Sequence, residues 1–186
     1  MNTERSHLYL ICPGFHDQAL THSFITNLSH HSIHLDNLLI FPTDQYPPYS
    51  GVHVSHYLQK KCQNQLQELT LIAFSAGVVA AVTAAWQWQL QGRNIKGLIA
   101  FDGWGVPLWG NFPIYRISHD QFTHDSSMIL GTGSMNFYAD PAVEHLDLWR
   151  SPHLVRGWMT QTTSFNGIVL SQMSLIDFLM TIISTI

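Results

Sequence analysis

Six short apolar runs, separated by longer stretches, constrain the fold of this chain more than any other sequence feature. The runs are Leu8–Cys12, Leu38–Phe41, Leu69–Phe74, Ile95–Phe101, Ile114–Ser118 and Met135–Ala139. Apolar residues stand at consecutive positions in them, as in parallel strands that helices cover on both faces. The pattern predicts an α/β fold, a three-layer sandwich whose mostly parallel sheet has about six strands with helices on both faces.

The stretches between the runs contain predicted helices. Gly51–Glu68 carries Gln and Lys on one face, and Ala76–Gln91 is rich in Ala and ends before Gly92. The apolar stretch Ile168–Ile186 contains Asp177 and several Ser and Thr residues, which favours a core-facing helix over a membrane span. No repeat or linker divides the 186 residues, so we expect residues 1–186 to form a single domain.

The composition of the chain indicates which partners it can bind and in which cellular compartment we expect it. Eight Lys and Arg against twelve Asp and Glu give a net charge of -4, which argues against binding to nucleic acid. Two cysteines, Cys12 and Cys62, are too few for a disulfide framework, and the first residues lack the features of a signal peptide. We therefore expect a cytoplasmic protein. Charged residues make up only 11% of the chain, which favours self-association into a homo-oligomer.

The junction between an apolar run and an Ala-rich helix holds the most informative residue, Ser75. In Ala73-Phe-Ser75-Ala-Gly77, small residues flank the serine on both sides. A sharp strand-to-helix turn needs small neighbours, and it lifts the hydroxyl clear of the sheet beside the free N–H groups of the helix N-terminus. A serine before an Ala-rich helix can also be an ordinary N-cap.

This segment resembles the nucleophile elbow G-x-S-x-G of the α/β-hydrolases, with Ala73 in place of the first glycine. The segment from Leu8 to Asp17 is similar to the first core strand and oxyanion loop of the same family, with Pro13 where the family often has His. The resemblance extends from Leu8 to about Leu148. It implies a small hydrolase without a sizeable lid domain, in which the insert from Gly103 to Asn111 forms at most a short flap.

The family order of nucleophile, acid and histidine suggests the remaining residues of a triad. For the acid, the resemblance favours Asp120, which follows the run Ile114–Ser118; Asp102 is the alternative and Asp125 a weaker one. For the base it favours His145, with the other candidates being His153 and His124. A histidine suits this role because its pKa near neutrality lets it take and return a proton.

The resemblance also implies an oxyanion hole, in which the backbone N–H of Ala76 and that of Phe15 or His16 would bind the oxyanion. Trp104 and Trp109 follow Asp102 in a Gly- and Pro-rich loop, so we expect them to wall an apolar acyl pocket. No cofactor is expected. His53 and His56 would share a helix face, but no third ligand is fixed by spacing, so no metal site is expected either.

Together these residues predict a serine hydrolase that acts on a carboxylic ester or thioester through a covalent acyl-enzyme. Its partner would be a small acyl substrate, with no role for nucleic acid or a membrane span. Two alternatives stay open: a non-catalytic binding protein that keeps the fold, and an acyltransferase that uses the same triad.

Overall fold

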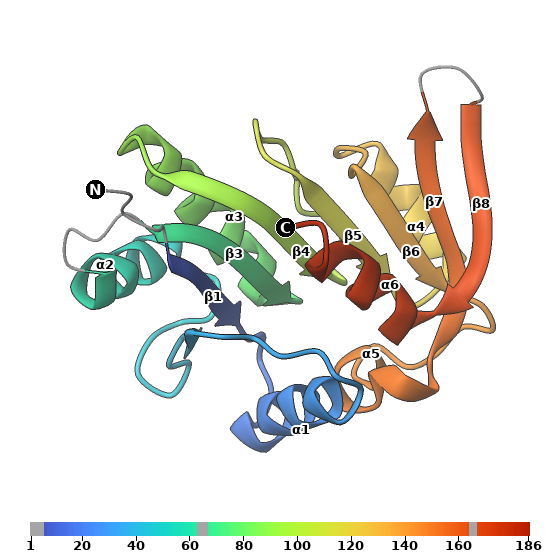
Figure 1. Cartoon of the computed structure of the whole chain (residues 1–186), viewed down its shortest axis with the longest axis horizontal. Helices are drawn as coiled ribbons and strands as arrows, with labels where there is room; N and C mark the ends of the chain where they lie inside the picture. Colours follow the sequence, from blue (N-terminus) through green and yellow to red (C-terminus); the bar gives the residue numbers. More distant parts are fainter. Residues whose placement is uncertain (1–5, 63–66, 164–166) are drawn as a thin grey trace.

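One mixed sheet organises the chain. The computed structural model describes residues 6–62, 67–163 and 167–186, in which eight strands are hydrogen-bonded in the order β2-β1-β3-β4-β5-β6-β7-β8. The strands are β1 (Ser6–Cys12), β2 (Leu38–Ile40), β3 (Gln67–Phe74), β4 (Asn94–Phe101), β5 (Ile114–Ser118), β6 (Met135–Ala139), β7 (Arg156–Thr163) and β8 (Gly167–Ser174). Strands β1 to β6 are parallel to one another, whereas β7 is antiparallel to β6 and β8 is antiparallel to β7. Figure 1 shows β7 and β8 as a long hairpin at one edge of the sheet.

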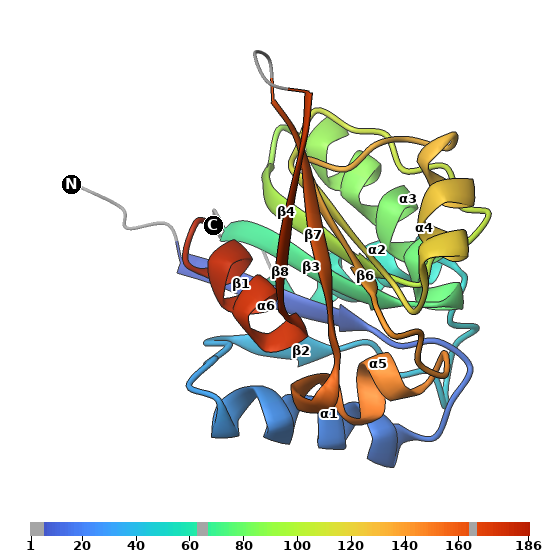
Figure 2. The same cartoon turned by 90° about the vertical axis from the view of Figure 1, so that its right-hand side faces the viewer.

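Helices cover both faces of this sheet. They are α1 (Gln18–His30), α2 (Gly51–Cys62), α3 (Ala76–Leu90), α4 (Gln121–Met128), α5 (Asp147–Arg150) and α6 (Leu175–Ile183), with a 3-10 turn at Pro152–Leu154. Figure 2 shows α2, α3 and α4 on one side and α1, α5 and α6 on the other. The expected fold class, a three-layer α/β sandwich with a mostly parallel sheet, is therefore confirmed.

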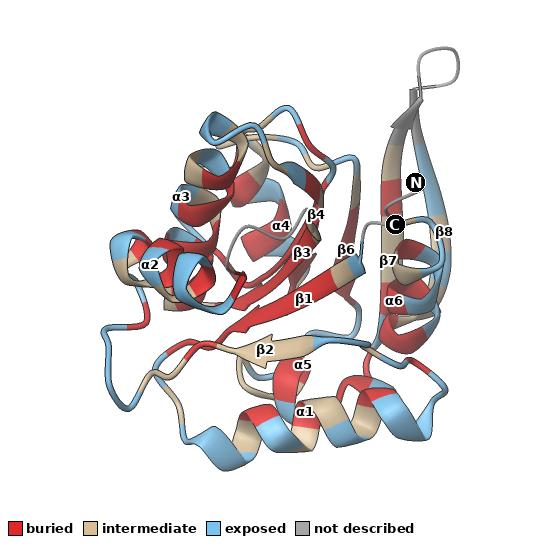
Figure 3. Ribbon diagram, turned by 60° about the vertical axis from the view of Figure 1, so that its left-hand side comes forward, coloured by how far each residue is buried: buried red, intermediate tan, exposed pale blue. Residues whose placement is uncertain are grey.

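Alternate residues of the strands form two separate cores. On β1, Leu8 and Leu10 pack with α2 and α3, whereas Tyr9 and Ile11 pack with α1, α5 and α6. The central strands are consequently buried at consecutive positions, as Figure 3 shows in red. This double burial explains why the runs in the sequence are continuously apolar rather than alternating.

The C-terminal region differs from the expectation. The stretch Ile168–Ile186 is not one helix, because its first part belongs to β8 and α6 begins only at Leu175. Ser174 starts the helix there: its hydroxyl accepts a hydrogen bond from the Asp177 N–H, 3.1 Å away, and donates one to the Asp177 carboxylate, 2.6 Å away. The sheet thus has two strands more than predicted. Within the described residues, no helix combines the length and apolarity needed to cross a membrane.

Two smaller differences concern helix bounds. The helix predicted at Gly51–Glu68 ends at Cys62; residues 63–66 lie outside the described part of the chain, and the last two residues of the range belong to β3. The helix predicted at Ala76–Gln91 is α3, which ends one residue earlier.

The strand order reverses between β1 and β3. From β1 the chain passes to β2 on one side, and β3 then pairs with β1 on its other side. In open parallel sheets, ligands bind at the carboxyl ends of the strands beside such a reversal. The loop after β1 and the turn after β3 meet at this point, which places Gly14 and Ser75 next to each other.

Candidate active site

Ser75 occupies a strained turn between β3 and α3. Its φ of 54° and ψ of -122° lie in a region that residues with a side chain rarely adopt, and its N–H donates to the Phe101 carbonyl at 2.9 Å. Its hydroxyl makes no capping hydrogen bond to α3. The N-cap alternative is therefore not adopted, and the geometry is that of a serine raised above the end of the sheet.

Close backbone approach around this turn depends on two glycines. A Cβ on Gly77 would overlap the Cys12 carbonyl oxygen and lie 2.6 Å from that of Pro13, so the first turn of α3 packs directly on the loop after β1. A Cβ on Gly14 would lie 2.9 Å from both the Phe74 carbonyl oxygen and the Ser75 Cβ. The small residue after the serine is thus a steric requirement.

Replacing Gly77 with alanine is expected to lower the free energy of unfolding by more than about 2 kcal/mol, because backbone atoms, not flexible side chains, would have to move. Gly97→Ala is the matched control, since its Cβ would first meet the Tyr115 ring, 3.2 Å away. Urea unfolding of both variants measures the difference. Equal losses of stability would contradict the close-approach argument.

Asp102 lies at the end of β4, next to β3 in the sheet. Its side chain is only 1% exposed, and its backbone has a φ of 48°. The carboxylate accepts three hydrogen bonds: the His119 N–H reaches Oδ1 at 2.9 Å, while Nδ1 of His119 and Nδ1 of His145 reach Oδ2 at 2.8 and 2.6 Å. These donors supply the partners that a buried carboxylate needs.

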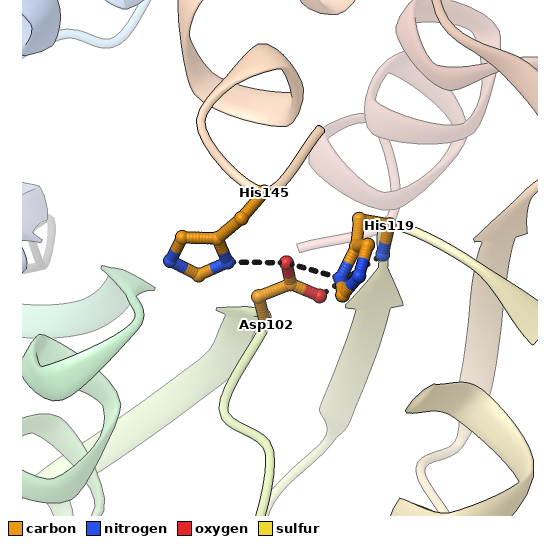
Figure 4. A group of neighbouring side chains, drawn as sticks. All are labelled: Asp102, His119 and His145. Carbon is orange, nitrogen blue, oxygen red and sulfur yellow. Dashed lines mark hydrogen bonds and ion pairs between the residues drawn. The ribbon is translucent and has the colours of Figure 1, made fainter. Parts of the chain in front are cut away.

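His145 lies between β6 and α5 and reaches back over the sheet. A carboxylate offers only acceptors, so Nδ1 of His145 carries the proton in this contact and Nε2 is the basic atom of the neutral ring. The ring packs on Phe74, the residue before Ser75, with centroids 4.8 Å apart. This contact places His145 on the serine side of Asp102. Figure 4 shows His119 on the other side of the carboxylate.

A pocket of about 470 Å³ joins these side chains. Ser75, Asp102, His119 and His145 all line it, and Ala76, Val79, Trp104, Val106 and Thr123 complete the wall. Four neighbouring parallel strands, β3 to β6, thus supply one polar side chain each from their carboxyl ends or the loops that follow.

The predicted tryptophans have different positions. Trp104 is 65% exposed at the rim of the pocket, and its indole N–H donates to the Ser126 hydroxyl at 3.1 Å. Trp109 does not line this pocket; its carbonyl accepts a hydrogen bond from Trp86. The segment between them is anchored by Arg116, which donates to the Val106 carbonyl at 3.2 Å. Burial lowers the pKa of Arg116 to about 10.

The main-chain N–H groups of Phe15 and His16, in the loop after β1, differ in their hydrogen bonds. The N–H of His16 is engaged by the Gly14 carbonyl at 3.1 Å, whereas no hydrogen bond of the Phe15 N–H is found among the described residues. Nε2 of His16 lies 2.9 Å from the Thr21 hydroxyl, at hydrogen-bond distance, and the ring of His16 lies 5.4 Å from that of Phe74. Burial, and secondly the charge of His145, lower the pKa of His16, while Asp17 acts in the opposite direction. Of the two main-chain N–H groups, only that of His16 is thus engaged by the backbone of the described residues.

Asp120, the favoured acid in the sequence, does not contact His145. It is the N-cap of α4, where its Oδ1 accepts the Thr123 N–H at 2.7 Å. Burial raises the pKa of Asp120, but hydrogen bonds from Thr123 and the charge of His119 outweigh it, so the net pKa lies below the ordinary value. The carboxylate that binds His145 is that of Asp102, the alternative acid candidate. Asp102 follows β4, which lies between β3 and β5 in the sheet.

The other sequence candidates lie elsewhere. Asp125 is exposed on α4, and the ring of His124 is buried against Tyr138, with centroids 5.0 Å apart. His153 lies in the 3-10 turn, and its ring stacks on that of His31. None of these three contacts Asp102. His119, in contrast, was not among the candidates, although its position directly after the run Ile114–Ser118 is a signal that could have identified it.

One group of side chains in the described residues has the composition of a metal site. The ligand atoms of Asp102, His119 and His145 lie within 4.8 Å of one another. Both Nδ1 atoms, however, lie at hydrogen-bond distance from the same carboxylate oxygen, so a cation would have to displace both ring protons. His53 is engaged differently, with its Nδ1 2.7 Å from the Ser50 hydroxyl and its ring stacked on Tyr46.

Comparison with known proteins finds similar chains among solved structures. No protein-family model matches the sequence, and a search of curated proteins finds no relative. Among solved structures, the chain is similar to YbtT, described as a type II thioesterase from the Yersiniabactin NRPS/PKS biosynthetic pathway. The identity is 13% and the TM-score 0.44, over 81% of this chain and 91% of that one. The mostly parallel sheet carries a serine at the strand-to-helix turn after β3, as the resemblance in the sequence implies.

Proposed function

We propose that this protein is a serine hydrolase that cleaves a carboxylic ester or thioester through a covalent acyl-enzyme. The observation that carries the proposal is the 2.6 Å hydrogen bond from His145 to the buried Asp102, in a pocket that the strained Ser75 also lines. A nucleophile, a base and an orienting acid on one pocket are the parts that acyl transfer to a serine requires.

The first half of the reaction forms the acyl-enzyme. The Ser75 oxygen attacks the carbonyl carbon of the substrate while Nε2 of His145 takes the hydroxyl proton. The N–H groups of Ala76 and Phe15 donate to the resulting oxyanion. When the intermediate collapses, the bond to the leaving group breaks, and His145 returns its proton to the departing alkoxide or thiolate.

The second half restores the enzyme. Water gives a proton to Nε2 of His145 and attacks the acyl carbon, and the bond between that carbon and the Ser75 oxygen then breaks. The serine recovers its proton and the carboxylic acid leaves. Throughout, Asp102 keeps the proton of His145 on Nδ1 and stabilises the imidazolium.

The pocket walls favour an apolar acyl group. Ala76, Val79, Trp104 and Val106 present hydrocarbon or aromatic surface, and the titratable side chains of the pocket are Asp102, His119 and His145.

Hydrolysis of p-nitrophenyl butyrate and of a butyryl thioester, each with and without EDTA, tests the proposal. We expect hydrolysis that EDTA leaves unchanged, because no step needs a metal ion. The cluster of Asp102, His119 and His145 supports a second candidate, a metal-dependent hydrolase. Loss of activity with EDTA and recovery with Zn²⁺ would favour that candidate and overturn the serine mechanism.

The two alternatives from the sequence give different outcomes. A non-catalytic binding protein would neither release p-nitrophenol nor acylate Ser75. An acyltransferase would acylate Ser75 and stop until an acceptor other than water is added. Mass spectrometry of the protein during the assay distinguishes these outcomes from hydrolysis with full turnover.

A further inference from the structure

A second histidine, His119, binds the same carboxylate as His145. We propose that His119 is a positioning residue: it fixes the Asp102 carboxylate so that Oδ2 faces His145, and it is itself flanked by Asp120. This inference rests on the proposed function, since it concerns how the acid of that triad is held. The chain of side chains is His145, Asp102, His119 and Asp120.

Two donors from one residue hold both oxygens of Asp102. The main-chain N–H of His119 reaches Oδ1 at 2.9 Å and its Nδ1 reaches Oδ2 at 2.8 Å. The terminal torsion of an aspartate is broad, so a single hydrogen bond would leave the carboxylate free to turn. Donors on different oxygens restrict that rotation, and the orientation they select directs Oδ2 to His145, as Figure 4 shows.

The contacts of His119 differ from those of the proposed base, His145. Nδ1 of His119 faces Asp102, and its Nε2 lies 3.6 Å from Oδ2 of Asp120. Both ring nitrogens therefore lie near carboxylates, although only Nδ1 is within hydrogen-bond distance of one. His145, in contrast, has only its Nδ1 engaged with a carboxylate, and its ring lies against the residue preceding Ser75.

The backbone of His119 also supports the loop that carries His145. Its carbonyl accepts a hydrogen bond from the Val143 N–H at 3.0 Å. Side-chain substitution leaves this bond and the N–H bond to Asp102 in place. A substitution at His119 therefore tests the Nδ1 contact rather than the path of the loop.

The test compares His119→Asn, His119→Gln and His119→Ala. The side-chain amide of Asn places an N–H one bond from Cγ, where Nδ1 of histidine lies, whereas the amide of Gln reaches the position of Nε2. We expect His119→Asn to keep kcat within about fivefold, and His119→Gln and His119→Ala to lower kcat about 10- to 100-fold with little change in KM. Circular dichroism and thermal unfolding report whether each variant is folded.

A merely structural role would affect the amount of folded protein and not separate Asn from Gln. Equal kcat values for folded His119→Asn and His119→Gln, or a change in KM alone, would overturn the positioning role. If His119→Ala does not fold, the Asn and Gln pair decides the question. Proton NMR adds a second readout: we expect two low-field Nδ1–H signals in the wild type and one in His119→Asn.

The labelling rate of Ser75 with a fluorophosphonate separates failure of this proposal from failure of the proposed function. A wild-type protein that is not labelled overturns the serine mechanism itself. A labelled wild type together with equally fast labelling of folded His119→Ala leaves the serine mechanism intact and overturns only the role of His119.

Discussion

Replacing Ser75 with alanine is expected to reduce kcat by about 10⁴- to 10⁶-fold, because the acyl-enzyme can then no longer form. The fold should persist. Alanine has the same Cβ and meets the same backbone strain at a φ of 54°, and the lost hydroxyl makes no capping hydrogen bond. Initial rates with p-nitrophenyl butyrate measure the effect.

Ser184→Ala is the matched control for this variant. Ser184 lies after α6, where its hydroxyl donates to the Thr181 carbonyl, on the opposite side of the sheet from α3. We expect its kcat to equal that of the wild type. A Ser75→Ala protein that is folded and still hydrolyses the ester at the wild-type rate would exclude Ser75 as the nucleophile.

The second large effect distinguishes two aspartates. Asp102→Asn is expected to lower kcat by about 10⁴-fold, because an amide in this position no longer fixes the proton of His145 on Nδ1. Asp120→Asn should keep kcat within about threefold, since asparagine is as good an N-cap for α4 as aspartate. Both changes replace one oxygen with nitrogen, so they differ in position and hardly in size.

Kinetics of the two variants at neutral pH make the comparison, with thermal unfolding to confirm that both are folded. The assignment of the acid to Asp102 requires a large difference between them in the stated direction. An inactive Asp120→Asn beside a fully active Asp102→Asn would instead support the acid that the chain order favours.

A comparison of Ser75 with Asp120 shows how far the sequence could predict the site. Ser75 and Asp120 both stand directly before helices, and either could be a cap or a functional group. In the structure, Asp120 caps α4 and Ser75 caps nothing. Small residues around Ser75 indicate the tight turn, because a side chain at Gly77 would overlap backbone. Asp120 is of a residue type that is common at the N-cap, and its Oδ1 accepts the Thr123 N–H.

The order of the strands along the chain does not tell which strand ends lie side by side in the sheet. The partner of His145 depends on which strand end lies closest to the returning loop, and that is β4 rather than β5. Asp102 also binds His119, because His119 follows β5, the strand next to β4. Sequence order lists the strand ends, whereas the distances between them come from pairing and sheet twist.

The parallel part of the fold was predictable because it has a strong signal. Strands buried on both faces read as continuous apolar runs, and all six runs are strands. The antiparallel strands β7 and β8 lack such a continuous apolar run. On β8, Val169 and Leu170 are exposed, at 40% and 55%. A strand so exposed has no run of buried residues, so its apolar positions were joined to those of α6 in the predicted helix.

Intact-mass spectrometry after incubation with a fluorophosphonate tests the central claim, an activated Ser75, most directly. Attack by the Ser75 oxygen on phosphorus expels fluoride, and the mass rises by one phosphonyl group. We predict a single adduct on the wild type, mapped to Ser75 by peptide analysis and absent from Ser75→Ala. A folded wild-type protein that gains no adduct, or one whose adduct persists in Ser75→Ala, would contradict the account.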